Sequence, residues 1–240
     1  MRRLLVGLML LWGCGETDLL KQEVKGLSEF EKAKLITKLW QRCEQGVNDA
    51  QAVTGATVVG AEQTPDERIR VGEKRIRILE EALPYGRRAF ELAPLTSPSC
   101  TYWFARCASY LGWEYDIVGQ IEVQQGTERE DAALVKCGEE RRRKAKVALT
   151  DGVKALLHYV RVYYEYAPNV LIYEWLEINY ELLGRLPEAY LTARDLVRRL
   201  ENLKRTGASP AEVGAWLEKY KDVTQQLEQK MRDAMIPIPK

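Results

Sequence analysis

The chain has 240 residues, 46% of them hydrophobic, and its 36 basic and 35 acidic side chains leave a net charge of +1. This apolar share is sufficient for a buried core and excludes an intrinsically disordered chain. Because charges of both signs are interspersed along the sequence, they argue against a dominant role in binding nucleic acid or a membrane surface.

The first 13 residues have the layout of an export signal. Two arginines give a positive start, an apolar run follows from Leu4 to Trp12, and Gly13 precedes Cys14. The run is about half of the roughly 20 residues that a helix needs to cross a bilayer. We therefore expect residues 1–13 to be a signal peptide and not a permanent anchor.

The tetrapeptide Leu-Trp-Gly-Cys at 11–14 resembles the bacterial lipobox, in which a leucine and a small residue direct cleavage and lipidation at the cysteine. Trp12 departs from the pattern, because a smaller residue is usual there. The resemblance implies a lipoprotein of the bacterial cell envelope that faces the periplasm, lipidated at Cys14, with residues 14–27 as a lipid-anchored tether. Gly15 favours the outer over the inner membrane. The alternatives are an ordinary signal peptide with a free thiol, or an N-terminal helix that packs.

Once Cys14 carries lipid, four cysteines remain: Cys43, Cys100, Cys107 and Cys137. An even number in an oxidising compartment permits disulfides. Cys100 and Cys107 lie two turns apart on one predicted helix, about 10 Å along its axis, which is too far for a bridge between them. Because zinc-type cysteine pairs are missing and the chain has one histidine, we expect no metal site and no cofactor. We interpret the cysteines as buried apolar side chains.

Helix start signals and apolar spacing predict an almost entirely helical chain. Residues 28–63 should form an N-terminal helix, which begins with a capping box at Ser28, and a loop rich in glycine and β-branched residues. The expected buried face of this helix is Phe30, Ala33, Ile36, Trp40, Cys43 and Val47. Three later starts combine a hydroxyl cap with proline at the first helical position: Thr64-Pro65, Ser97-Pro98 and Ser209-Pro210.

The middle of the chain has weaker signals. Residues 117–130 alternate more than they follow a helical period, so we expect a loop or a lone hairpin arm there. A helical stretch from about Glu130 to Tyr166 follows, either as one helix or as two separated at Asp151-Gly152.

The segment from Tyr173 to Val197 resembles the tetratricopeptide repeat. The aromatic, leucine, tyrosine, turn-glycine, small and apolar positions of that unit are matched by Tyr173, Leu176, Tyr180, Gly184, Ala189, Ala193 and Leu196. Glu177 departs from it, because the family has a small residue at this place. A similar aromatic, small and tyrosine pattern occurs earlier at Trp103, Cys107 and Tyr110.

This resemblance implies an all-α, tetratricopeptide-like solenoid of helical hairpins that winds into a right-handed superhelix. Degenerate repeats would occupy residues 64–205, flanked by the N-terminal helix and by a C-terminal capping helix and tail over residues 206–240. One helical hairpin cannot bury its apolar face alone, so neighbouring hairpins must stack. An unrelated helical bundle is the alternative.

No residue set in the sequence predicts catalysis. His158 is the only histidine, and neither a nucleophile elbow nor a phosphate-binding glycine loop is present. The basic run at 141–146 follows two glutamates, which favours a salt-bridged helix face over an anionic partner. We therefore expect a binding protein and not an enzyme.

Aromatic residues late in the chain are the best candidates for a binding surface: Tyr159, Tyr163, Tyr164, Tyr166 and Trp175. Core packing is the competing interpretation. Solenoids bind protein segments through aromatic anchors, so the leading hypothesis is an envelope scaffold or assembly lipoprotein that binds a protein or peptide partner and no nucleic acid. The alternative is a small-molecule-binding accessory of a substrate uptake system, which a closed apolar cavity would favour.

Overall fold

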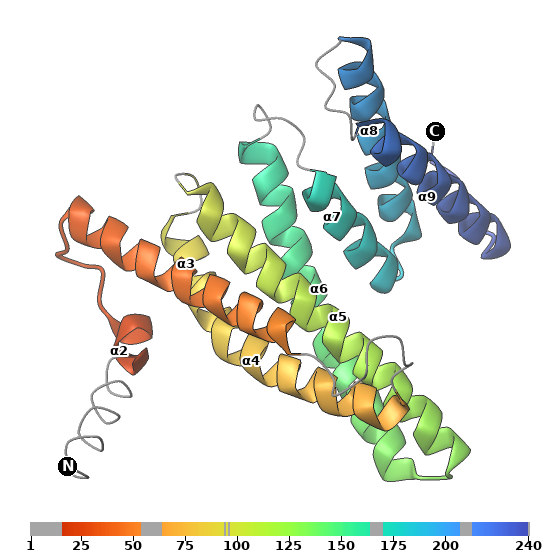
Figure 1. The fold of residues 1–240 in the computed structure, drawn as a ribbon, viewed down its shortest axis with the longest axis horizontal. Helices are drawn as coiled ribbons and strands as arrows, with labels where there is room; N and C mark the ends of the chain where they lie inside the picture. Colours follow the sequence, from red (N-terminus) through yellow and green to blue (C-terminus); the bar gives the residue numbers. More distant parts are fainter. Residues whose placement is uncertain are drawn as a thin grey trace.

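The computed structural model describes residues 16–53, 64–93, 95, 97–163, 170–206 and 213–239 (Figure 1). This part of the chain is 87% helical and contains no strand, which confirms the all-α prediction. Its helices are α2 (Glu16–Lys21), α3 (Glu29–Ala52), α4 (Pro65–Leu92), α5 (Pro98–Glu128), α6 (Ala132–Val162), α7 (Val170–Leu182), α8 (Leu186–Arg205) and α9 (Val213–Asp233).

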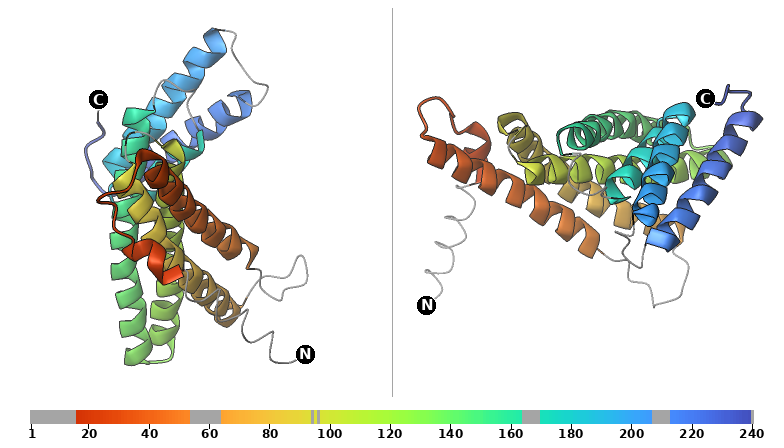
Figure 2. Two further views of the ribbon diagram at one scale, coloured as in Figure 1. Left: turned by 90° about the vertical axis from the view of Figure 1, so that its left-hand side faces the viewer. Right: turned by 90° about the horizontal axis from the view of Figure 1, so that it is seen from above.

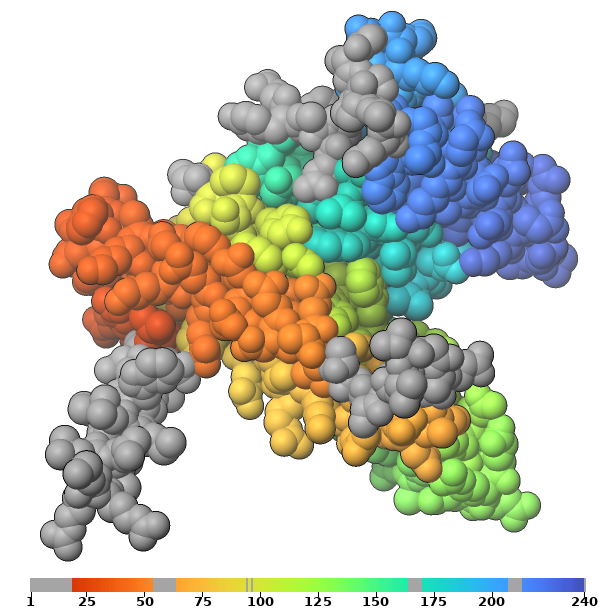
Figure 3. Space-filling model, viewed as in Figure 1, coloured from red at the N-terminus to blue at the C-terminus, as the bar shows by residue number. Residues whose placement is uncertain are grey.

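From α3 to α9, each helix packs on its neighbours in sequence, and α3 also contacts α5. Helices α2 and α9 lie toward opposite ends of an elongated molecule (Figure 2). The space-filling view shows α3 lying across the face formed by α4 and α5 (Figure 3). Both α4 and α6 therefore flank α5, and α8 and α9 form the far end.

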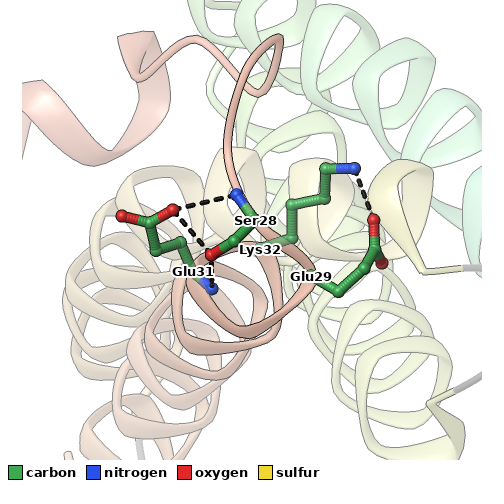
Figure 4. Close-up of polar contacts among 4 residues, drawn as sticks. All are labelled: Ser28, Glu29, Glu31 and Lys32. Atoms are coloured by element: carbon green, nitrogen blue, oxygen red, sulfur yellow. Dashed lines mark hydrogen bonds and ion pairs between the residues drawn. The ribbon is translucent and has the colours of Figure 1, made fainter.

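The capping box predicted at the start of α3 is present (Figure 4). The Ser28 N–H donates to Glu31 Oε2 at 2.9 Å, and the Glu31 N–H donates to Ser28 Oγ at 3.3 Å. Lys32 adds an ion pair with Glu29 at 2.7 Å. These bonds satisfy N–H groups that a helix start leaves without intrahelical partners.

Two of the later helix starts also have the predicted caps. The Glu67 N–H donates to Thr64 Oγ1 at 3.2 Å, and the Cys100 N–H donates to Ser97 Oγ at 3.4 Å. The predicted start at Ser209 lies outside the described residues.

The buried face of α3 differs from the predicted one. Phe30 is 79% exposed and Ala33 is also exposed, whereas the buried residues are Leu35, Leu39, Cys43, Val47 and Ala50. Two apolar stripes run side by side on this helix and share Cys43 and Val47. Contact with α4 and α5 selects the leucine stripe, and Ile36 and Trp40 pack beside it half-buried.

The predicted loop or hairpin arm at 117–130 is wrong, and of the two alternatives for the stretch from Glu130 the structure has the single helix. Residues up to Glu128 belong to α5, and α6 continues without interruption through Gly152. The alternating pattern arises because α5 is covered on several sides, so that small and polar residues such as Gly119 and Gln125 are buried too.

Small residues recur every seven positions on the facing sides of α5 and α6: Gly112, Gly119 and Gly126 on α5, and Gly138, Ala145 and Gly152 on α6. A Cβ atom on Gly119 would lie 2.7 Å from the Gly138 carbonyl oxygen, and one on Gly138 would lie 2.6 Å from the Gly119 carbonyl oxygen. The two backbones are therefore in direct contact, with no room for a side chain between them. A seven-residue spacing keeps such a seam on one side of both helices.

Arginines on both neighbours of α5 neutralise its buried carboxylates. Glu114, which is 2% exposed, forms an ion pair with Arg68 at 3.0 Å and accepts a hydrogen bond from Arg75 at 2.9 Å. Glu122 forms an ion pair with Arg141 at 2.9 Å. The first arginine of the basic run therefore lies in an ion pair between helices, because a carboxylate buried without a partner is costly.

The turn between α7 and α8 contains the predicted glycine. Gly184 has φ of +73°, its N–H donates to the Glu181 carbonyl at 2.9 Å, and the Arg185 N–H donates to the Tyr180 carbonyl at 2.8 Å. This left-handed conformation ends a helix and is favourable for glycine. Tyr173 and Tyr180, two of the repeat positions, are each 6% exposed and belong to the core.

Replacing Gly119 by alanine should destabilise the protein, although alanine is the better helix former. The new methyl group meets the Gly138 backbone, which cannot move aside as a side chain could. We expect urea denaturation followed by circular dichroism to show a free energy of unfolding lower by about 1–3 kcal/mol.

Gly214→Ala is the matched control, because a Cβ atom on Gly214 in α9 meets no atom within 4 Å. It should leave stability unchanged or raise it by up to about 1 kcal/mol. Equal unfolding curves for Gly119→Ala and the wild type would show that the α5–α6 contact is looser than described.

Candidate functional site

Half of the site residues predicted from the sequence lie in the part of the chain that the structure describes. The described ones are Tyr159, Tyr163 and Trp175. Outside the described residues lie Cys14, Tyr164 and Tyr166.

The three described aromatic residues come together through Tyr102 of α5, which the sequence analysis did not identify. The Tyr102 ring centroid lies 6.5 Å from that of Tyr159 and 5.6 Å from that of Trp175, and the Tyr159 and Tyr163 centroids are 5.2 Å apart. Arg106 lies over the Trp175 ring at 5.6 Å. We call these four rings the aromatic cluster.

The aromatic cluster joins α5, α6 and α7 and offers little free surface. Trp175 is 9% exposed and the three tyrosines are half-buried. Burial raises the pKa of Tyr159 and Tyr163, so both hydroxyls stay protonated around neutral pH. Packing accounts for most of the area of these rings.

An open groove of about 670 Å³ lies between α4 and α6, with α5 as its floor. Its apolar surface is formed by Leu83 and Pro84 of α4, Leu111 of α5, and Val147 and Ala148 of α6. Val147 is 65% exposed and contributes apolar surface to the α6 wall. We call this feature the α4–α6 groove.

Charged side chains border the α4–α6 groove. Arg87 on α4 pairs with Asp151 on α6 at 2.6 Å. The Lys144 ammonium lies 5.8 Å from the centroid of the Tyr115 ring, and the Tyr115 hydroxyl donates to Glu80. Burial, followed by this contact with Glu80, raises the pKa of Tyr115, which therefore remains a neutral donor.

Helix α2 borders one end of the groove. Leu20 lines it, and Arg88 of α4 donates to the backbone carbonyl of Gln22 just after α2. The α4 rim extends from Glu80 to Glu91, which corresponds to about 16 Å, or three helical turns. The N-terminal part of the described chain is thus built into the groove.

Sequence patterns did not reveal this groove, since its residues come from four helices and none belongs to a motif. Val147 was the one available signal, as an apolar residue after the basic run 141–146. Only the packing of α4 and α6 on α5 brings it opposite Leu83.

The structure also shows where the candidates for catalysis and metal binding lie. His158 is half-buried, and its ring meets Phe90 edge-on with centroids 5.3 Å apart. Within the described residues, no three histidine, cysteine or acidic side chains gather as a metal site would require. None of the described helices combines the length and the apolarity needed to cross a membrane.

A buried carboxylate lies between α7 and α9. Glu177 is 6% exposed. Its burial, together with the nearby carboxylates of Glu181 and Glu174, raises its pKa to about 7, although Lys230 of α9 lowers the pKa in part. Lys230 and Lys219 of α9 pair with Glu181 and with Glu174, the latter at 2.5 Å. The residue that departs from the repeat pattern therefore titrates near neutral pH.

The chain matches no protein family model, and no curated protein or solved structure has significant similarity to it.

Glu177 should make the protein less stable as pH rises. Its folded pKa of about 7 lies above the ordinary value of 4.5, so the folded state holds the proton more tightly than the unfolded state. The free energy of unfolding should fall by about 1–3 kcal/mol from about pH 5 to pH 8, measured by urea denaturation.

Glu177→Gln should abolish most of that fall and exceed the wild type in stability at the higher pH, because the amide carries no charge to bury. Glu218→Gln, on the exposed side of α9, should keep the wild-type profile. A Glu177→Gln variant with the full wild-type pH dependence would contradict the assignment.

Proposed function

We propose that this chain is a non-enzymatic lipoprotein of the bacterial cell envelope that binds an amphipathic helix of a partner protein in the α4–α6 groove. The observation that carries the proposal is the open apolar floor of this groove between two charged rims. Amphipathic helices bind such grooves by placing residues at three- and four-position spacing on the apolar floor.

The dimensions and charges of the groove support a helical partner. Its rim of about 16 Å accommodates about three turns, so apolar residues at positions i, i+4 and i+7 would reach Leu83, Pro84 and Val147, which are the more exposed apolar side chains of the lining. Both rims carry charges of both signs, with Glu80 and Arg87 on α4 and Lys144 and Asp151 on α6. Such rims suit the polar face of an amphipathic helix.

The second candidate function is the small-molecule accessory of an uptake system. A volume of about 670 Å³ lies within the range of small-ligand sites, which favours this alternative. The groove is open, however, whereas a captured small molecule usually has most of its surface enclosed. We therefore place the protein partner first.

We propose further that the chain is a degenerate tetratricopeptide-like solenoid with a right-handed superhelix and flanking terminal helices. Support comes from α7 and α8, which span 36 residues from Val170 to Arg205, close to the 34-residue period of the family. The α5–α6 hairpin spans 65 residues, from Pro98 to Val162, or about two periods. Helix α9 packs on α8 as a cap would.

Lipidation at Cys14 would place the groove close to the membrane. Only Gly15 separates Cys14 from α2, and Leu20 of α2 already lines the groove. An anchored chain would therefore present the groove to other membrane-bound proteins of the envelope, which is the setting expected of a scaffold.

The anchor is tested by Cys14→Ser in the full-length protein. Without an acceptor for acyl chains, the variant should move from the membrane fraction to the soluble fraction of lysed cells, since the acyl chains supply the membrane affinity. Retention of the variant in the membrane fraction at the wild-type level would contradict lipidation at Cys14.

The groove is tested by photo-crosslinking in cells with a photoreactive amino acid at Lys144, on its exposed rim. We expect one discrete adduct, whose crosslinked peptide lies in an amphipathic helix of an envelope protein. Val147→Asp in the same chain should reduce the adduct at least tenfold, because it puts a charge on the apolar floor.

Phe30→Asp is the control, since Phe30 is an exposed apolar residue that does not line the groove, and it should leave the adduct unchanged. Equal loss in both variants, or an adduct indifferent to Val147→Asp, would exclude the groove as the binding site. A small molecule found by native mass spectrometry and lost in Val147→Asp would instead support the alternative function.

A further inference from the structure

Two cysteines from different helices meet in the core between α3 and α5. Cys43 and Cys107 are both 0% exposed and belong to the same group of packed core residues. The Cys43 thiol donates to the Trp103 carbonyl at 3.5 Å, which is the carbonyl one helical turn before Cys107. Cys43 therefore lies directly beside the turn of α5 that carries Cys107.

The Cys107 thiol donates to the Leu79 carbonyl of α4 at 3.7 Å, so both thiols lie in the packed core where α3, α4 and α5 meet. The neighbouring Cys43 thiol, followed by burial, raises the pKa of Cys107 well above its ordinary value. The thiolate is the reactive form, so the folded core does not favour an attack by Cys107. Both cysteines are also 0% exposed, so an oxidant cannot reach their sulfurs in the folded core, and a covalent link between them must form during folding.

We propose that Cys43 and Cys107 form a disulfide when the chain folds in an oxidising compartment. Cys43 contacts the turn of α5 that carries Cys107, both residues belong to one packed core cluster, and α3 packs directly on α5, so a disulfide requires movement of side chains and not of helices. Export, which the first 13 residues predict, would supply the oxidising conditions.

The other two described cysteines are placed differently. The Cys100 thiol donates to Ser97 Oγ at 3.1 Å, two helical turns from Cys107. Cys137 is exposed near the start of α6, where its thiol lies 3.8 Å from Glu122. Because α5 separates Cys100 from the end of the hairpin that holds Cys137 by about 30 Å, these two cannot pair.

The bond forms by two thiol–disulfide exchanges with a disulfide oxidant, such as oxidised glutathione or a thiol–disulfide oxidoreductase. One cysteine thiolate attacks a sulfur of the oxidant, which gives a mixed disulfide and releases one oxidant thiolate. The second cysteine thiolate attacks the mixed disulfide at the protein sulfur and releases the other oxidant thiolate. The pair loses two protons and two electrons, and the oxidant ends as two thiols.

This link would join α3 to α5 across a 65-residue loop (43 to 107). Closing a loop of this length restricts the unfolded chain, which raises the stability of the folded state. It would also fix α3 over α5 and so reinforce the side of the molecule opposite to α6.

The test uses the full-length chain isolated from the envelope, denatured in iodoacetamide without reductant, digested and examined by mass spectrometry. We expect the Cys43 and Cys107 peptides as one linked species, lighter than their sum by two hydrogens and lost after reduction. The Cys100 and Cys137 peptides should be alkylated without reduction, and Cys137 serves as the internal control because it is exposed. Alkylation of both Cys43 and Cys107, or a link of Cys43 to Cys100, would overturn the proposal.

A second measurement does not depend on digestion. Reductant should lower the thermal midpoint of the wild type by about 5–15 °C. The same reductant should leave the midpoint of Cys107→Ala unchanged, whereas Cys100→Ala should respond as the wild type does. An unchanged wild-type midpoint in reductant would count against the disulfide even if a linked peptide were found, since it would show that the link is not part of the native fold.

Discussion

The close approach of α5 and α6 is the constraint on which the rest of the structure depends. Gly119 and Gly138 place the two backbones in contact, with each carbonyl oxygen occupying the space of the other residue's missing side chain. Because the seam recurs every seven residues, it holds two helices of 31 residues each in one register. Everything that packs on α5 must then use its remaining faces, and α3, α4 and α7 do so.

The groove follows from this arrangement. Helices α4 and α6 lie on two sides of α5 and run in the same direction (Figure 1). Their facing side chains form the walls of the groove, with Leu111 and Tyr115 of α5 at its base. Ion pairs to the buried Glu114 from α4 and to Glu122 from α6 bind both neighbours to α5. Separating such a pair would leave a buried charge without its partner. Moving α4 or α6 away from α5, and with it a wall of the groove, would therefore cost free energy.

The aromatic residues and the groove have different roles in this fold. Tyr102, Tyr159 and Trp175 pack three helices together and are largely covered, as rings that join helices commonly are. Val147 and Leu83 are less conspicuous in the sequence but lie in an open, apolar concavity. A large ring in the sequence indicates packing area, and its position in the fold decides whether that area is available to a partner.

The sequence alone determined the helical class, the capping boxes at Ser28 and Thr64, and the turn at Gly184. Each of these depends on interactions between residues that are close together in the chain. The sequence did not determine which stripe of α3 is buried or that 117–130 is helical, because the neighbouring helices decide both. Of the predicted binding residues, it placed Tyr159 near Tyr163 through their helical spacing. The groove, the buried Glu177 and the meeting of Cys43 with Cys107 join residues far apart in the chain, so only tertiary packing could bring them together.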